Sequence, residues 1–153
     1  AFPAVIGVIA MILWARHSDR TKERSWHVIG ACLLAVAGLI YAGNVSTLFT
    51  VMVALTLVTV GISASKPPLW SMPTLFLSGP AAAAGIAAIN SIGNLGGFVG
   101  PMMIGVIREQ TGSYSWGLYF VAGLLALSAL VVMILSARAN KSPTAELPHP
   151  HTH

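Results

Sequence analysis

The stretch WARHSDRTKER, residues 14–24, is the most densely charged part of the chain, and apolar segments lie on both sides of it. It holds four of the eight Lys and Arg residues and two of the four acidic residues of the 153-residue chain. Short loops rich in Lys and Arg are retained on the cytoplasmic side of a membrane. The stretch therefore predicts a short cytoplasmic loop that joins two transmembrane helices.

The composition of the whole chain predicts that the lipid bilayer is its solvent. Hydrophobic residues make up 56% of the chain and charged residues only 8%, whereas soluble domains carry about 25% charged residues. We therefore expect an all-α integral membrane protein. The formal charge of +4 does not indicate a nucleic-acid partner, because the basic residues lie at the ends of apolar runs and not on one polar face.

Five apolar runs lie within residues 1–137, which we expect to form the transmembrane region, and a helix needs about 20 apolar residues to cross a bilayer. The first run, residues 1–15, is shorter and is expected to be the tail of a span. The other runs are residues 28–42 (possible start at Trp26), 47–65, 81–107 and 114–137. Residues 138–153 are polar and rich in Pro, which predicts a disordered tail.

The distribution of basic residues predicts the orientation of the chain. Four spans after the charged stretch return the tail to the side of that stretch. The basic residues expected on this side are Arg16, Arg20, Lys22, Arg24, Arg138 and Lys141. The opposite side holds only Arg108, and Lys66 lies in or beside a span. The positive-inside rule then places the charged loop and the C-terminus in the cytoplasm.

The segment KPPLWSMPTLFLSG, residues 66–79, allows two interpretations. Pro67, Pro68 and Pro73 disfavour a straight helix. The third span either ends at Lys66, with an interfacial piece after it, or continues as a kinked helix to about Leu77. Irregular backbone at membrane depth is tolerated where it lines a cavity.

The charged stretch resembles the loop signature of the major facilitator superfamily of transporters, G-x-x-x-D-R-x-G-R-R. Asp19, Arg20 and Arg24 match that signature. The departures are Ala15 and Lys22 at the two Gly positions and Glu23 at the first Arg position. In this superfamily the Asp and Arg brace the closed cytoplasmic side, so the resemblance implies a conformational role for Asp19, Arg20 and Arg24. The alternative is a topology signal combined with an ordinary helix cap.

Two further blocks resemble the anion:cation symporter family within that superfamily, in particular its tartrate-transporter-like and aromatic-acid-permease-like members. Residues 67–105 resemble its tenth and eleventh helices, and HSDRTKERSWH, residues 17–27, resembles its loop between helices eight and nine. The resemblance implies the C-terminal part, about helices eight to twelve, of a twelve-helix fold. The missing N-terminal half would be a partner of this part.

The implied function is that of a secondary active transporter in a bacterial inner membrane. It would move a small organic anion, a carboxylate, by alternating access, with coupled cation (proton) symport. A free-standing small accessory membrane protein without transport activity is the alternative. No arrangement typical of an enzyme or of a cofactor site is present in the sequence, and His149, His151 and His153 are interpreted as part of the tail and not as a metal site.

Five residues are candidates for contact with the substrate. Asn90 and Asn94 lie four apart and share a helix face, where polar side chains in a span usually face the bundle interior. Lys66 could pair with a substrate carboxylate, and Trp70 and Ser71 could line the same cavity. The alternatives are an interhelical hydrogen bond for the Asn pair, a snorkelling lysine and an interfacial Trp.

The fourth span carries two overlapping G-x-x-x-G pairs. Gly93 and Gly97 form one, Gly96 and Gly100 form the other, and Pro101 follows. Small residues four apart let a neighbouring backbone approach closely. The pattern predicts a tightly packed helix, which serves either ordinary packing or gating.

Overall fold

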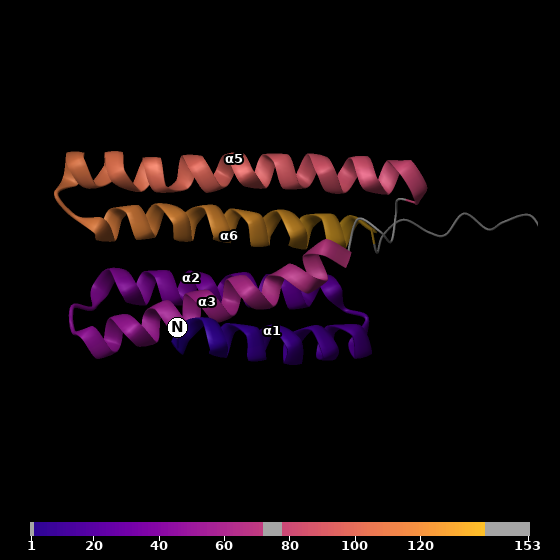
Figure 1. The fold of residues 1–153 in the computed structure, drawn as a ribbon, viewed down its shortest axis with the longest axis horizontal. Coiled ribbons are helices and arrows are strands. Elements are labelled where there is room, and N and C mark those ends of the chain that lie inside the picture. Colours follow the sequence, from indigo (N-terminus) through magenta and orange to yellow (C-terminus); the bar gives the residue numbers. More distant parts are fainter. Residues whose placement is uncertain (1, 72–77, 140–153) are drawn as a thin grey trace, which may run out of the picture.

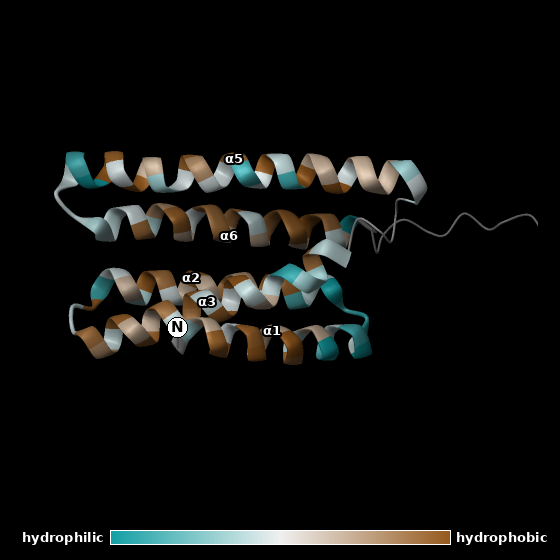
Figure 2. Cartoon of the chain, in the orientation of Figure 1, coloured by the Kyte–Doolittle hydropathy of each residue, from teal (hydrophilic) through white to brown (hydrophobic). Residues whose placement is uncertain are grey.

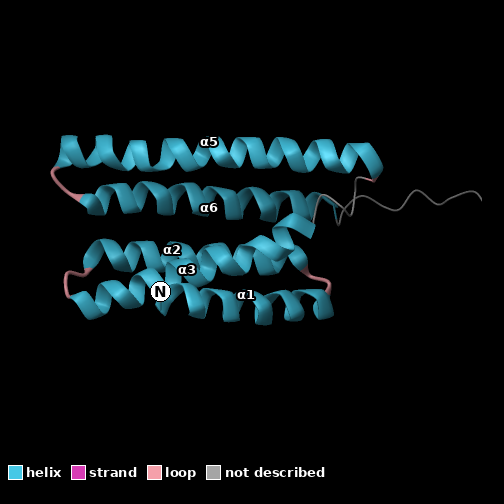
Figure 3. Ribbon diagram, in the orientation of Figure 1, coloured by secondary structure: helices cyan, strands magenta, loops and turns pink. Residues whose placement is uncertain are grey.

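The structure is a computed structural model that describes residues 2–71 and 78–139, and these residues form five helices (Figures 1 and 3). The helices are α1 (Phe2–Thr21), α2 (Arg24–Asn44), α3 (Leu48–Ser71), α5 (Gly79–Thr111) and α6 (Tyr114–Ala139). They lie side by side with their long axes roughly aligned. The prediction of an all-α protein is confirmed for the described residues.

Four of the five helices, α2, α3, α5 and α6, are long and apolar enough to cross a membrane. Each of the four helices ends beyond the apolar run that predicted it. The backbone hydrogen bonds of a helix do not require apolar side chains, so a helix can continue into the polar region at the membrane surface. Large apolar side chains lie on the outside of the bundle, and Leu48, Phe49 and Phe98 are each more than 70% exposed. Figure 2 shows hydrophobic residues along the helices and hydrophilic ones near their ends, with further hydrophilic residues in the middle of α5.

The prediction of a loop over residues 14–24 is wrong for most of that stretch. Helix α1 continues to Thr21, so only Lys22 and Glu23 separate it from α2. Arg and Lys are good helix formers, and charged side chains at the end of a span can lie in water without interrupting the helix.

We name the end of the bundle where α1 ends, α2 begins and α3 ends the charged end of the bundle.

Helix α3 passes through Pro67 and Pro68 and ends at Ser71. The structure therefore favours the continuing helix over a break at Lys66. Pro68 is buried, and the Ser71 hydroxyl donates a hydrogen bond to its carbonyl at 2.9 Å. Neighbouring helices and Ser side chains are the usual means by which Pro is tolerated in a membrane helix. Pro73 and the predicted end near Leu77 lie outside the described residues, as does the tail after Ala139.

Helix α2 is the central element of the bundle. It packs against α3 and α6 and, less extensively, against α1, while α1 also packs against α3. Helix α5 lies at one edge, where it packs against α6 and buries none of its residues (Figure 1). The core is made largely of small side chains, and Ala31, Ala35 and Ala54 are each at most 1% exposed. Small residues let these helices approach closely.

The ends of α1 and α5 share one backbone geometry. Lys22 has φ 56° and its N–H donates to the Ser18 carbonyl at 3.0 Å, while Gly112 has φ 70° and donates to the Arg108 carbonyl at 2.8 Å. Both are left-handed caps, in which Gly is favoured because it has no Cβ. Lys22 thus adopts a glycine conformation at the position where the transporter signature has its second Gly.

Replacing Lys22 by Gly is expected to stabilise the protein by about 1 kcal/mol, because a left-handed non-Gly residue costs roughly that much. Gly112→Ala, which introduces the same strain at the matching cap, should lower the free energy of unfolding by a similar amount. Denaturation in detergent micelles would measure both. A loss of stability in the Lys22→Gly variant would contradict this account of the cap.

Candidate functional site

Arg24 connects three helices at the charged end of the bundle. Its Nη2 lies 3.9 Å from Oδ1 of Asp19 at the end of α1, and its Nη1 donates to the Ser71 carbonyl at the end of α3 at 3.5 Å. The Asp19 side chain is 71% exposed, so the ion pair is weak. The contact with Ser71 also places a cation at a helix C-terminus, where the helix dipole favours it.

The structure thus brings together two of the three residues predicted as a conformational brace. Arg20 lies exposed in the last turn of α1, where its charge also complements the helix dipole. We name the region from Trp14 to His27 the corner, because it contains the end of α1, the Lys22–Glu23 connection and the start of α2.

Sequence reasoning missed a second cluster in the corner. Nδ1 of His17 lies 2.8 Å from Nε2 of His27, and Nδ1 of His27 lies 2.7 Å from the Glu23 carbonyl oxygen. The Trp14 indole N–H donates to the His27 carbonyl at 3.0 Å, and the Trp14 and His27 rings meet edge to face. The signal in the sequence was a pair of His residues placed nearly symmetrically about the two-residue connection.

The five substrate candidates do not form one site in the described structure. Lys66, Trp70 and Ser71 lie in the last part of α3 at the charged end, and Lys66 and Trp70 are exposed. Asn90 and Asn94 are exposed on α5, on the far side of α6 from α3 (Figure 1). The two groups of candidates could line one substrate cavity only if helices outside the described residues enclosed it.

Lys66 is five residues from the end of α3, a distance of about 7.5 Å along the helix axis. Its ammonium group can reach the polar surface from there, so the structure leaves the snorkelling alternative open. Ser71 contributes its carbonyl to Arg24, and its hydroxyl donates within α3. Its backbone is therefore part of the contact between the helices at the charged end.

The glycine face of α5, defined by Gly93, Gly96, Gly97 and Gly100, is uncovered by the described residues. A Cβ added at any of the four would meet nothing within 4 Å. Pro101 continues the same helix and is exposed. The predicted tight packing is therefore not made within the described part of the chain. Close glycine contacts occur instead between α2 and α3, at Gly38 and Gly61.

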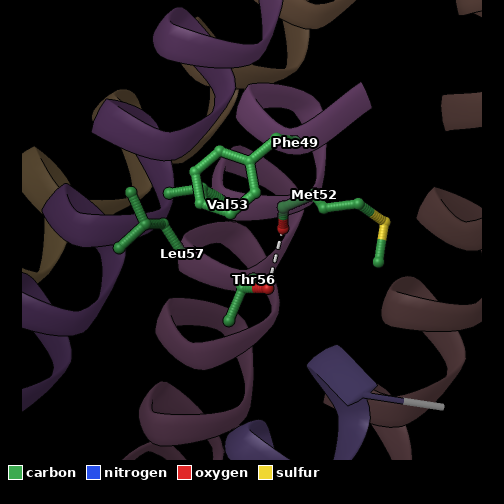
Figure 4. A pocket seen from close by; sticks show the side chains of 5 residues that line it. All are labelled: Phe49, Met52, Val53, Thr56 and Leu57. Carbon is green, nitrogen blue, oxygen red and sulfur yellow. Dashed lines mark hydrogen bonds between the residues drawn. The ribbon is translucent and has the colours of Figure 1, made fainter. Parts of the chain in front are cut away.

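Two surface hollows differ in chemistry. A groove of about 320 Å³ on α3 is lined by Phe49, Met52, Val53, Thr56 and Leu57 (Figure 4). Its only hydroxyl, that of Thr56, already donates to the Met52 carbonyl at 2.7 Å. An apolar groove without a charge suits a lipid chain or a neighbouring helix better than a carboxylate.

The second hollow, of about 480 Å³, lies at the opposite end of the bundle from the corner, between α5 and α6. Residues from both helices and their connection line it: Pro101, Ile104, Gly105, Arg108, Glu109, Gly112 and Tyr114. The Arg108 guanidinium lies 4.2 Å from the centroid of the Tyr114 ring, a cation–π contact that orients it. Glu109 beside it opposes the attraction of an anion to this hollow.

The described helices define the class of the protein. Four helices long enough to span a bilayer, an apolar exterior and charges gathered at the helix ends are the features of a multi-pass α-helical membrane protein.

The chain belongs to the Major Facilitator Superfamily, whose family model matches residues 1–152. It is 65% identical over 151 residues to a protein of Agrobacterium vitis named "Putative tartrate transporter", and this match covers 99% of the chain and 35% of the relative. It is 33% identical to the quinolone resistance transporter of Acinetobacter baumannii, covering 94% of the chain and 33% of that protein.

A third relative, the inner membrane transport protein RhmT of Escherichia coli strain K12, is 34% identical, with 93% of the chain and 32% of that protein covered. The chain thus spans about a third of the length of the curated relatives it matches. No solved structure was found to match it.

Proposed function

We propose that the chain is the C-terminal part, about helices eight to twelve, of a secondary active transporter that moves a small organic anion bearing carboxylates. The observation that carries this proposal is the 65% identity, over 99% of the chain, to a relative named for tartrate transport. Alternating access with a coupled cation, as a symporter, is the proposed mechanism. The role is that of a carrier and not of an enzyme.

A free-standing accessory protein is the less favoured alternative. The uncovered glycine face of α5 supports a larger assembly, because small-residue faces allow close packing with a neighbouring helix. We propose that the N-terminal half of the same transporter supplies this partner and closes the substrate cavity between the two halves. Asn90 and Asn94 would then be covered as well, and they could bind the anion's hydroxyl or carboxylate oxygens.

Transport of tartrate by the full-length protein tests the function directly. Proteoliposomes should exchange internal for external tartrate, whereas threitol, in which both carboxylates are replaced by alcohols, should not compete. The control isolates the carboxylates, because the carbon chain and the central hydroxyls are the same. Equal competition by threitol would exclude an anion carrier.

Lys66 is proposed to attract the substrate carboxylate. Lys66→Ala should lower tartrate uptake by about tenfold, and Lys66→Arg should retain most of it, because the charge is conserved and a single charge-assisted contact contributes about that much. Initial uptake rates, normalised to the amount of protein in the membrane, provide the measurement. Near-normal uptake by both variants would establish that Lys66 only snorkels to the membrane surface.

The charged end and the tail are proposed to lie in the cytoplasm of a bacterial cell. Single cysteines at Ser25 and Ser142, with Cys32 replaced, should react with an impermeant thiol reagent only after the cells are permeabilised. Ser46→Cys provides the matched control, since Ser46 is exposed between α2 and α3 at the other end of the bundle and should react in intact cells. Labelling of Ser25→Cys in intact cells would reverse the orientation.

A further inference from the structure

The hydrogen bond between His17 on α1 and His27 on α2 joins the two helices of the corner. His27 lies in the first turns of α2 and is 7% exposed, whereas His17 is exposed at the end of α1. The ring nitrogens that face each other are 2.8 Å apart. Protons can therefore reach the pair from solvent through His17, while His27 connects the pair to the buried side of α2.

The partners of His27 determine where its proton lies. The Glu23 carbonyl can only accept a hydrogen bond, so Nδ1 of His27, 2.7 Å away, must donate to it. In a neutral His27, Nε2 is then an acceptor, and Nδ1 of His17 donates to it. If the pair gains one proton, one ring is an imidazolium and the other still offers a lone pair, so the hydrogen bond is kept.

A second added proton removes the bond. Both facing nitrogens would then carry hydrogen, neither could accept, and two positive rings would repel at close range. The charged groups at this end, on the connection and on α2 and the helices packed against it, are Arg16, Asp19, Arg20, Lys22, Glu23, Arg24, Lys66 and Arg138. Six of these eight are basic, so the surroundings do not compensate for a second imidazolium.

We propose that His17 and His27 form a proton-sensitive latch that closes the corner at neutral pH and releases it on acidification of the charged side. Release would free the start of α2, three residues from His27, where Arg24 contacts Asp19 and Ser71. His17 is thus a positioning residue for Arg24. Its effect on transport rests on the function proposed above, whereas opening of the corner does not.

Ser18 provides a reporter of the latch. It follows His17, is 1% exposed, and its carbonyl accepts the Lys22 N–H that ends α1. In the full-length protein with Ser18→Cys as its only cysteine, we compare labelling by an impermeant maleimide with and without His17→Asn. The Asn amide can donate in place of Nδ1–H but cannot take up a proton, so it keeps the latch closed at every pH.

At about pH 7.5 both proteins should label slowly. At about pH 5.5 the open corner can take up two protons, whereas the closed pair keeps its hydrogen bond with only one, so the protein with His17 should label faster than the Asn variant. The expected ratio is about tenfold, which corresponds to the loss of one buried hydrogen bond. Comparing the two proteins at the same pH cancels the effect of pH on the thiol. His17→Ala, which has no donor, should label rapidly at both values. The same ratio at both pH values would overturn the latch.

Tartrate exchange gives a second measurement that does not depend on the folding of Ser18→Cys. Exchange by the otherwise unmodified protein should fall by about tenfold when the charged side is brought from about pH 7.5 to about pH 5.5, and His17→Asn should abolish the fall. Replacing His149, His151 and His153 by Asn is the matched control and should leave the fall unchanged. A fall that persists in His17→Asn would overturn the latch, and absent exchange with pH-dependent labelling would refute only the transport function.

Discussion

Gly61→Ala is expected to reduce the folded full-length protein in the membrane several-fold. A Cβ at this position would lie 2.6 Å from both the Ala31 carbonyl oxygen and the Ala35 backbone nitrogen of α2. Backbone atoms cannot turn aside as a flexible side chain can, so α2 and α3 would have to separate. We expect a loss of about 3 kcal/mol, the upper part of the range for overpacking, and a change of this size lowers the abundance of a protein in cells.

Gly123→Ala provides the matched control for that prediction. Gly123 lies within α6, and a Cβ added there would meet nothing within 4 Å. The control makes the same chemical change in a membrane helix without the clash, and Ala is the better helix former. Quantitative detection of both variants in purified membranes gives the comparison. Equal abundance of the two would show that α2 and α3 are not in backbone contact at Gly61.

Gly97→Leu is expected to abolish transport while protein remains in the membrane. No atom of the described residues lies within 4 Å of a Cβ added at Gly97. The substitution therefore does not disturb the packing among the five described helices. In the full-length transporter we propose that the N-terminal half covers this face, and a leucine would keep the two halves apart. Alternating access would then fail, although the C-terminal helices fold.

The measurement is tartrate uptake divided by the amount of protein in the membrane, with Gly97→Ala as the control that adds only a methyl group. Gly97→Ala should retain measurable uptake and Gly97→Leu should not. Near-normal uptake by Gly97→Leu would show that Gly97 faces lipid or a loose interface. Loss of both protein and uptake would contradict the prediction that the protein still folds with a leucine at this position.

The glycine pattern shows why packing partners could not be predicted from the sequence. The overlapping G-x-x-x-G pairs of α5 are the clearest packing motif in the chain, yet their face is uncovered in the described structure. Gly38 and Gly61 belong to no recognised packing motif, but they permit the contact between α2 and α3. A motif describes one surface, whereas a contact depends on which second surface is placed against it.

The sequence by itself determined the membrane class, the helices and their approximate extents, because the length of an apolar run and the cost of unpaired backbone groups in lipid leave few alternatives. Its resemblance to the transporter signature also implied a conformational role for Asp19, Arg20 and Arg24. Only the tertiary structure decided that α1 continues to Thr21, that α3 passes through Pro67 and Pro68, and that His17 meets His27. The contact between His17 and His27 depends on the two-residue connection and on the rotation of each helix about its axis. The continuation of α3 depends on the burial of Pro68 and on the Ser71 hydrogen bond. Local sequence patterns specify none of these.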